Sequence, residues 1–118
     1  MLAPSLSTTE TIAKLNDRVR QGLDCQARIV ITANLLAQVS DGTPRSQIIA
    51  QAKVLRAVRN CTFSSDSPER DLAFFEVDGK RACFKIDYYD LALEYGSDDP
   101  ADASVTRRVM TIMSPQDM

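Results

Sequence analysis

One short segment holds the residues of this chain whose type and spacing could do chemistry. Six carboxylates fall within sixteen residues: Asp87, Asp90, Glu94, Asp98, Asp99 and Asp102. Clustered oxygen ligands can hold Ca²⁺ or Mg²⁺, and paired carboxylates can act as acid and base on a sugar. The segment lacks the D-x-D-x-D-G loop and the distal Glu of an EF-hand. We therefore expect an acidic surface loop here rather than a metal site.

The residue types that the chain lacks narrow its chemistry further. The 118 residues include no His and no Trp, which excludes Ser-His-Asp and Cys-His pairs and any imidazole that titrates near neutral pH. Cys25, Cys61 and Cys83 form no C-x-x-C pair, so we expect reduced thiols. These absences favour a protein that acts by binding over an enzyme, and we expect no cofactor.

Two adjacent tyrosines lie at the start of the acidic segment. Tyr88 and Tyr89 are adjacent, so a strand turns them to opposite faces, and the alternation predicts that Tyr89 is the exposed one. A tyrosine among carboxylates suits a protein interface, although a structural tyrosine at a strand end is the alternative. The predicted surface for a basic partner protein consists of Asp87, Tyr89, Asp90, Glu94, Asp98, Asp99 and Asp102.

The formal net charge of −2 hides a separation of charge along the chain. Residues 1–63 carry +4, residues 64–104 carry −7 and residues 105–118 carry +1. Such a chain can steer a charged partner even though its total charge is small. Pairing of the two halves with each other is the alternative explanation.

The elements that must position these residues follow from local patterns. Residues 1–7 form a short irregular lead-in, and a helix then begins at Ser7 or Thr8 and ends at Gly22, with an apolar stripe of Ile12, Leu15, Val19 and Leu23. Residues 27–33 favour a strand buried on both faces. A short helical turn at Leu35, Leu36 and Val39 precedes a second helix over 44–60, capped by Thr43, with an apolar stripe that includes Ile48 and Ile49.

The second half of the chain has the alternation of strands. Residues 72–77 and 81–89 flank Asp78-Gly79, a strong hairpin signal. A last strand is predicted at 106–113, where Arg108, Met110 and Ile112 share one face, and 114–118 is a short tail. The sequence therefore predicts one α+β domain over 1–118, with two helices packed on a small, mostly antiparallel sheet of about four strands.

The run from Lys85 to Met113 resembles a known family. It reads KIDYYD, then GS and DPAD, then VT, RV and TIM. This resembles short bacterial proteins of about 100–120 residues and unknown function, common in alphaproteobacteria and on mobile elements. The resemblance implies no activity, and it implies an inhibitor or interaction factor rather than a housekeeping enzyme. The chain departs from the family pattern in its last five residues.

We therefore predict a cytoplasmic, non-enzymatic interaction protein whose acidic segment binds a basic partner. If that partner binds nucleic acid, the carboxylates would occupy phosphate positions, as in an anti-CRISPR or anti-restriction inhibitor. No apolar run is long enough for a membrane span.

Three alternatives stay open. The first is a carboxylate- or metal-dependent enzyme that uses Asp87, Asp90 and Glu94 around Lys85. The second is a nucleic-acid binder that uses the basic residues of helix 44–60, which a pI near 5.0 disfavours. The third is a homodimer that pairs its final strand as an open edge. The basic residues of that helix are Arg45, Lys53, Arg56 and Arg59.

Overall fold

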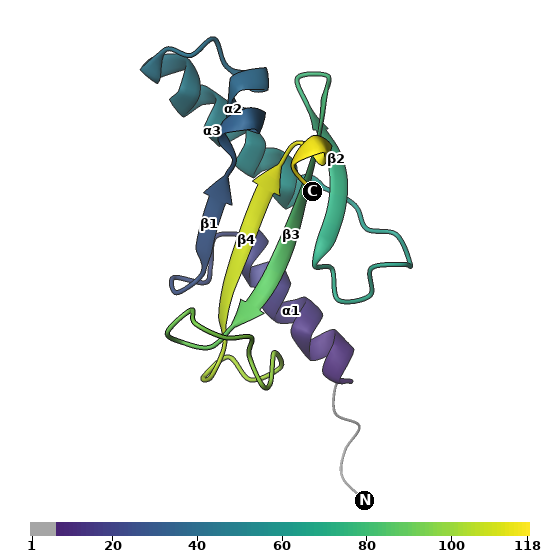
Figure 1. Cartoon of the computed structure of the whole chain (residues 1–118). Coiled ribbons are helices and arrows are strands. Elements are labelled where there is room, and N and C mark those ends of the chain that lie inside the picture. The colour runs from purple at the N-terminus through teal and green to yellow at the C-terminus, as the bar shows by residue number, and fades with distance from the viewer. Residues whose placement is uncertain (1–6) are drawn as a thin grey trace, which may run out of the picture.

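Three α-helices and four strands follow one another along residues 7–118, the part of the chain that this computed structural model describes (Figure 1). The predicted lead-in over 1–7 lies outside this range except for Ser7. In chain order the elements are α1 (Thr8–Arg20), β1 (Arg28–Ile31), α2 (Ala33–Val39), α3 (Pro44–Asn60), β2 (Leu72–Val77), β3 (Lys80–Tyr89), β4 (Arg107–Met113) and the 3₁₀ turn η1 (Pro115–Asp117).

The strands form one mixed sheet in the order β1-β4-β3-β2. The pairs β2–β3 and β3–β4 are antiparallel, and β1 runs parallel to β4. Asp78 and Gly79 join β2 to β3 with φ angles of 50° and 76°, both in the left-handed region that the tightest hairpin turns require. The prediction of an α+β fold with a mostly antiparallel sheet of about four strands is confirmed, and the short helical turn predicted at Leu35, Leu36 and Val39 is the two-turn helix α2.

Local signals explain where the two longer helices begin and end. The Ser7 hydroxyl accepts a hydrogen bond from the Glu10 amide at 3.1 Å, and the Thr43 hydroxyl caps α3 in the same way, with Pro44 at the first helical position. The α1 helix ends where Gly22 adopts a φ of 75°, as predicted. No helix among residues 7–118 combines the length and apolar character needed to span a membrane.

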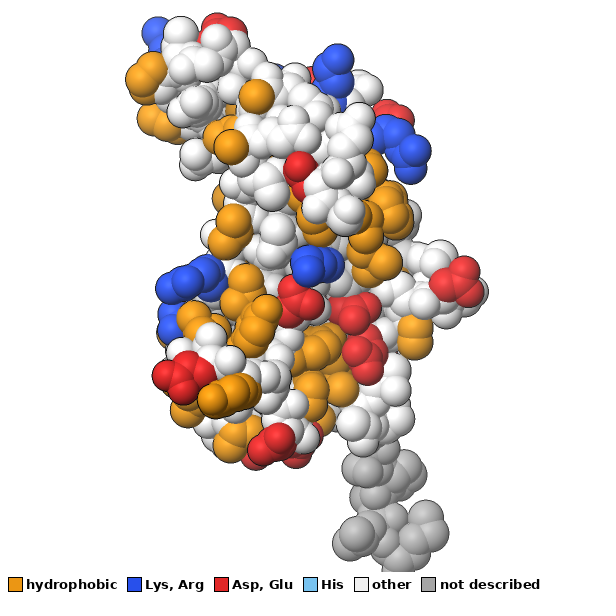
Figure 2. Space-filling model, in the orientation of Figure 1, with side chains coloured by type: hydrophobic (Ala, Val, Ile, Leu, Met, Phe, Trp, Pro, Cys, Tyr) orange, Lys and Arg blue, Asp and Glu red, His pale blue; other side chains and the backbone are white. Residues whose placement is uncertain are grey.

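The core lies between the sheet and two of the helices. In Figure 1, α1 and α3 lie behind the sheet, and the buried Val19, Val54 and Val58 of these helices belong to one cluster with Phe84 and Ile112 of the strands. Among residues 7–118, no α-helix lies on the opposite face of the sheet. Figure 2 views this open face, on which hydrophobic side chains are interspersed with acidic and basic ones.

The C-terminal turn covers one end of the open face. Cys83 and Met113 are partners across β3 and β4 and point away from the helices, yet both are buried. The turn η1 folds back over this end of the sheet (Figure 1). The hydroxyl of Thr32 and the side-chain amide of Asn34 donate hydrogen bonds to Asp117, at 2.8 and 3.1 Å. These bonds fasten residues near the C-terminus to the start of α2.

Three local predictions were wrong. Residues 28–31 form an exposed edge strand rather than a doubly buried one, because β1 has β4 as its single neighbour. The final strand is not an open edge, because β4 lies between β1 and β3. Ile48 and Ile49 are 69% and 50% exposed rather than buried, because the first turns of α3 project past the sheet (Figure 1).

Candidate functional site

The segment that joins β3 to β4, residues 90–106, is called the acidic loop below. It doubles back on the end of β3, where the amide of Asp90 donates to the carbonyl of Tyr95 at 2.8 Å and that of Ser97 donates to the carbonyl of Tyr88 at 3.0 Å. The hydroxyl of Thr106 donates to the carbonyl of Asp99 at 2.8 Å. The bond from Ser97 therefore ties the loop to the end of β3, and the other two bonds close turns within the loop.

The carboxylates of the acidic loop shape its own turns. Asp90 accepts a hydrogen bond from the Glu94 amide at 2.9 Å, and Asp99 accepts one from the Ala101 amide at 3.2 Å. Asp102 accepts from both the amide and the hydroxyl of Ser104, and these two bonds lower the pKa of its carboxyl. Aspartate favours turns through such bonds to nearby backbone, so the acidic composition has a structural role in the loop.

The predicted partner-binding residues do not form one pocket. Asp87 and Tyr89 lie on the open face of β3, partly exposed, and Asp87 forms an ion pair with Lys85 at 3.2 Å. Asp90, Glu94, Asp98, Asp99 and Asp102 are spread along the acidic loop. Within residues 7–118, no three Cys, Asp or Glu side chains are grouped so that they could hold a metal ion.

Three large apolar side chains of the same loop are exposed, and the two most exposed are Tyr95 and Leu91, ahead of Val105. Tyr95 is 72% exposed and Leu91 is 52% exposed. Neither residue was singled out from the sequence, although both lie between the carboxylates that were. An exposed tyrosine among acidic groups resembles an anchor residue of a protein interface, and Leu91 adds exposed apolar surface on the same loop.

A buried polar cluster of Asn16, Tyr88 and Arg108 lies beneath the acidic loop. Asn16 is fully buried in α1, and its amide nitrogen donates to the Tyr88 hydroxyl at 2.9 Å and to the Glu69 carbonyl at 3.0 Å. Its side-chain oxygen accepts a hydrogen bond from Nε of Arg108 at 2.8 Å. One side chain thus joins α1, β3, β4 and the segment before β2.

Arg108 is the cation of this cluster, and it is 2% exposed. Its guanidinium lies 5.0 Å from the centre of the Tyr88 ring, and Nη2 donates to the carbonyl of Pro100 in the acidic loop. Burial lowers the pKa of Arg108, with opposing contributions from Tyr88, Asp24 and Glu69. No ion pair to Arg108 occurs among the residues that the structure describes, so its charge is stabilised by hydrogen bonds, by the tyrosine ring and by the carboxylates of Asp24 and Glu69 at longer range.

Burial also controls the protonation of Tyr88. It raises the pKa of the phenol well above its ordinary value, and the neighbouring Asp71 and Glu69 add to this effect although the hydrogen bond from Asn16 opposes it. The phenol donates to the Glu69 carboxylate at 3.2 Å. Tyr88 is therefore a neutral donor at physiological pH.

A second charged group lies at the outer side of α1. Arg70 donates to Asp17 at 2.8 Å and to Glu10 at 3.4 Å, and Arg20 donates to Asp17 at 2.6 Å. Burial raises the pKa of Asp17, but the hydrogen bonds from the two arginines outweigh it, so the pKa is lowered overall. This group joins the segment before β2 to the helix.

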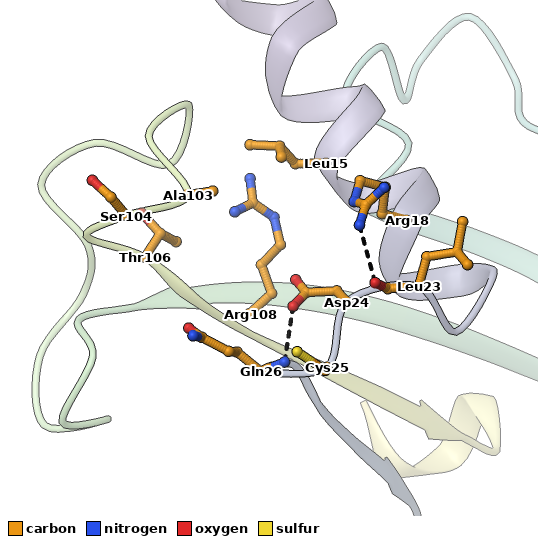
Figure 3. Close-up of a pocket in the computed structure, with 10 residues that line it drawn as sticks. All are labelled: Leu15, Arg18, Leu23, Asp24, Cys25, Gln26, Ala103, Ser104, Thr106 and Arg108. Carbon is orange, nitrogen blue, oxygen red and sulfur yellow. Dashed lines mark hydrogen bonds between the residues drawn. The ribbon is translucent and has the colours of Figure 1, made fainter.

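A cavity of about 350 Å³ opens beside Arg108. Figure 3 shows Arg108 in its centre, with acidic-loop residues on one side and residues of α1 and the α1–β1 connection on the other. Asp24 lies in that connection and accepts a hydrogen bond from the Gln26 amide at 3.0 Å, while Arg18 donates to the Leu23 carbonyl at 3.0 Å. The lining residues are Leu15, Arg18, Leu23, Asp24, Cys25, Gln26, Ala103, Ser104, Thr106 and Arg108.

The comparison with known families covers all of these elements. A family model described as "Protein of unknown function (DUF3768)" matches residues 8–117, from the first residue of α1 to the last of η1. The chain belongs to the DUF3768 family. The predicted membership in a family of unknown function is confirmed. No curated protein and no solved structure matches this DUF3768 chain.

The basic residues of α3 do not form an uncovered stripe in this DUF3768 protein. Arg45, Arg56 and Arg59 are exposed, but Lys53 forms an ion pair with Asp78 of the hairpin at 3.1 Å. An acidic side chain therefore faces the middle of the helix surface that would have to contact phosphates.

Sequence reasoning missed the polar cluster at the centre of the DUF3768 site. The alternation over 106–113 already placed Arg108 on the face of Met110 and Ile112, which the register confirms to be the core face. An arginine on the same face as Met110 and Ile112 was therefore the one feature of the sequence that could have predicted a buried cation. Asn16 gave no such signal, because a single polar residue within a helix is ordinary.

Proposed function

We propose that this protein is a protein-binding module and that its acidic loop docks on a basic surface of a partner. The observation that supports this best is the exposure of Tyr95 and Leu91 in a loop that has five carboxylates and no basic residue. An apolar anchor provides affinity when it enters a pocket, and surrounding carboxylates provide orientation and a faster encounter with a basic surface. The contact residues are Asp87, Tyr89, Asp90, Glu94, Asp98, Asp99 and Asp102, together with Tyr95 and Leu91.

The attachment of the loop fits a docking role. The hydrogen bonds of Arg108 to Pro100 and of Thr106 to Asp99 hold the inner side of the loop against the core. Asp99 and Asp102 close its turns. A loop that is held in this way loses less conformational freedom on binding than a free one, which improves affinity.

The spread of the carboxylates favours contact over carboxylate chemistry. A catalytic pair must converge on one reacting atom. Asp87 is instead paired with Lys85, and Asp90 is bonded to the Glu94 amide. The role we propose is accordingly steric and electrostatic, with no bond made or broken.

A finer form of the proposal concerns the class of partner. Carboxylates spaced along an exposed loop can occupy the positions of phosphates on a nucleic-acid-binding surface. The module would then inhibit a nucleic-acid-binding complex by competition, as an anti-CRISPR or anti-restriction factor does. In that case the partner cannot bind duplex DNA and this protein at the same time.

The charge on the loop can be removed without removing its turns. The triple variant Asp98→Asn, Asp99→Asn and Asp102→Asn keeps a side-chain oxygen at each turn and removes three negative charges. Asp41→Asn, Asp66→Asn and Glu76→Gln form the matched control, because they remove the same charge from exposed positions outside the loop. Tyr95→Ser tests the apolar anchor separately.

The measurement is affinity capture from the source organism, followed by titration of the purified pair. We expect a partner that the wild type and the control retain, and that the triple variant and Tyr95→Ser lose. Binding should weaken as the salt concentration rises, because the Debye length, over which charges in solution attract each other, shortens to roughly 3 Å at 1 M salt. A partner bound equally by the wild type and the triple variant at every salt concentration would refute the proposal, and failure of duplex DNA to compete would refute its finer form.

A further inference from the structure

The cavity beside Arg108 faces the inner side of the acidic loop rather than its exposed surface. Its walls come from the last turns of α1, the connection to β1, and residues 103–106. None of the residues proposed above to contact a protein partner lines it. A role for this cavity is therefore independent of the docking proposal.

Arg108 lines this cavity, and one nitrogen of its guanidinium has no hydrogen-bond partner among the described residues. Nε donates to Asn16 and Nη2 to Pro100, while Nη1 donates to none of the described residues. The arginine is almost wholly buried, yet Nη1 is not among the fully occluded unpaired atoms of residues 7–118. Figure 3 shows the guanidinium of Arg108 between Ala103 of the acidic loop and Leu15 and Arg18 of α1, so we infer that solvent or a ligand reaches Nη1 from the cavity.

The charges of the lining residues define what could bind. Arg18 and Arg108 provide two cations and Asp24 provides one anion, so the walls carry one net positive charge. Leu15, Leu23 and Ala103 provide apolar surface next to them. The hydroxyl of Ser104 already donates a hydrogen bond to the Asp102 carboxylate, and that of Thr106 donates one to the Asp99 carbonyl. The free donors are thus guanidinium groups.

From these groups we propose that the cavity binds a small aliphatic carboxylate. The carboxylate oxygens accept hydrogen bonds from Nη1 of Arg108 and from Arg18, and the aliphatic part lies against the leucines. A planar guanidinium matches a carboxylate well, and burial strengthens the bond. The ligand would form the direct ion pair that Arg108 does not make with any described residue.

A phosphate dianion suits the cavity less well. The carbonyl end of α1, which carries the negative end of the helix dipole, forms one wall. Asp24 adds a further negative charge. A single negative charge balances the net charge of the walls, and two would exceed it.

Isovalerate and its neutral amide, isovaleramide, provide a matched pair of probes. In amide correlation spectra recorded by NMR, isovalerate should shift the resonances of Gln26, Ser104 and Thr106 to saturation, and isovaleramide should not. Equal shifts from the two probes, or shifts that do not saturate, would overturn the proposal. Sodium chloride at the same ionic strength controls for a general salt effect.

Variants of the cavity must keep the fold, and changes at Arg108 disturb the buried cluster. Arg18→Gln is safer, because this residue is exposed, and it should weaken isovalerate binding about tenfold through loss of one charge-assisted bond. Ala103→Leu, on the exposed loop, should also weaken binding by filling the cavity. Arg45→Gln removes an exposed arginine elsewhere and should change affinity by less than about twofold. An equal loss of isovalerate affinity in Arg18→Gln and Arg45→Gln would contradict the proposal that Arg18 binds the carboxylate.

The carboxylate could belong to a free acid or to the end of a peptide. A short peptide that ends in leucine is compared with its C-terminally amidated form. Saturable shifts from the free peptide but not from the amide assign the site to chain termini, and shifts from isovalerate alone assign it to free acids. Binding of neither acid nor peptide overturns the proposal, whatever the result for the protein partner.

Discussion

Substitution of Asn16 by alanine is the sharpest test of the buried polar cluster. The variant loses three hydrogen bonds, from Asn16 to Tyr88 and to the Glu69 carbonyl, and from Arg108 to Asn16. A bond to a charged group contributes about 1.5–3 kcal/mol and a neutral one about 1 kcal/mol, so the expected loss in free energy of unfolding is about 4 kcal/mol. That is a large fraction of the roughly 5–15 kcal/mol that stabilises a domain.

Urea unfolding followed by far-ultraviolet circular dichroism measures this loss. The midpoint should fall while the dependence on urea stays constant, because the surface exposed on unfolding is nearly unchanged. Lys14→Ala is the matched control on the exposed side of the same helix, and it should change the free energy of unfolding by less than about 0.5 kcal/mol. A loss below about 1 kcal/mol in Asn16→Ala would show that the cluster is not a stabilising network.

Three further predictions follow from the same structure. Burial keeps Tyr88 protonated, so its stabilising contribution is present below its ordinary pKa of 10.0 and is lost as the pH rises further. Tyr88→Phe should therefore reduce the loss of unfolding free energy at alkaline pH. It should also remove the tyrosine that ionises at the highest pH in an ultraviolet titration. The lowered pKa of Asp17 gives a contribution that is present above pH 3.8 and is lost on acidification; Asp17→Asn should make stability less dependent on acid pH in urea titrations. Gly79 has a φ of 76°, so Gly79→Ala should lower the free energy of unfolding by about 1 kcal/mol, and an unchanged urea midpoint would contradict that strain.

Elements that depend on neighbours in sequence could be predicted. Thr43 and Pro44 predicted the start of the helix over 44–60, and Asp78 and Gly79 predicted the hairpin turn. Both elements occur where they were expected. These signals act within a few residues, so no knowledge of the rest of the fold was needed.

Features that depend on distant parts of the chain could not be predicted. The strand at 28–31 has the composition of a buried strand, but its position at the edge follows from parallel pairing with β4. Burial of Cys83 depends on η1, which lies about thirty residues later in the chain. The candidate site has the same character, because Asn16 and Arg108 are 92 residues apart and meet only in the folded chain.

The parallel pairing of β1 with β4 has a consequence for the order in which the chain folds. Gln26 and Arg107, which are hydrogen bonded beside this pair, are 81 residues apart, whereas the β2–β3 hairpin closes over two residues. Closure of a long loop costs more entropy, so contacts between distant segments form late. We expect the hairpin to form first and β4 to join it. The β1 strand then has a template on which to pair, so its parallel pairing with β4 is expected late in folding.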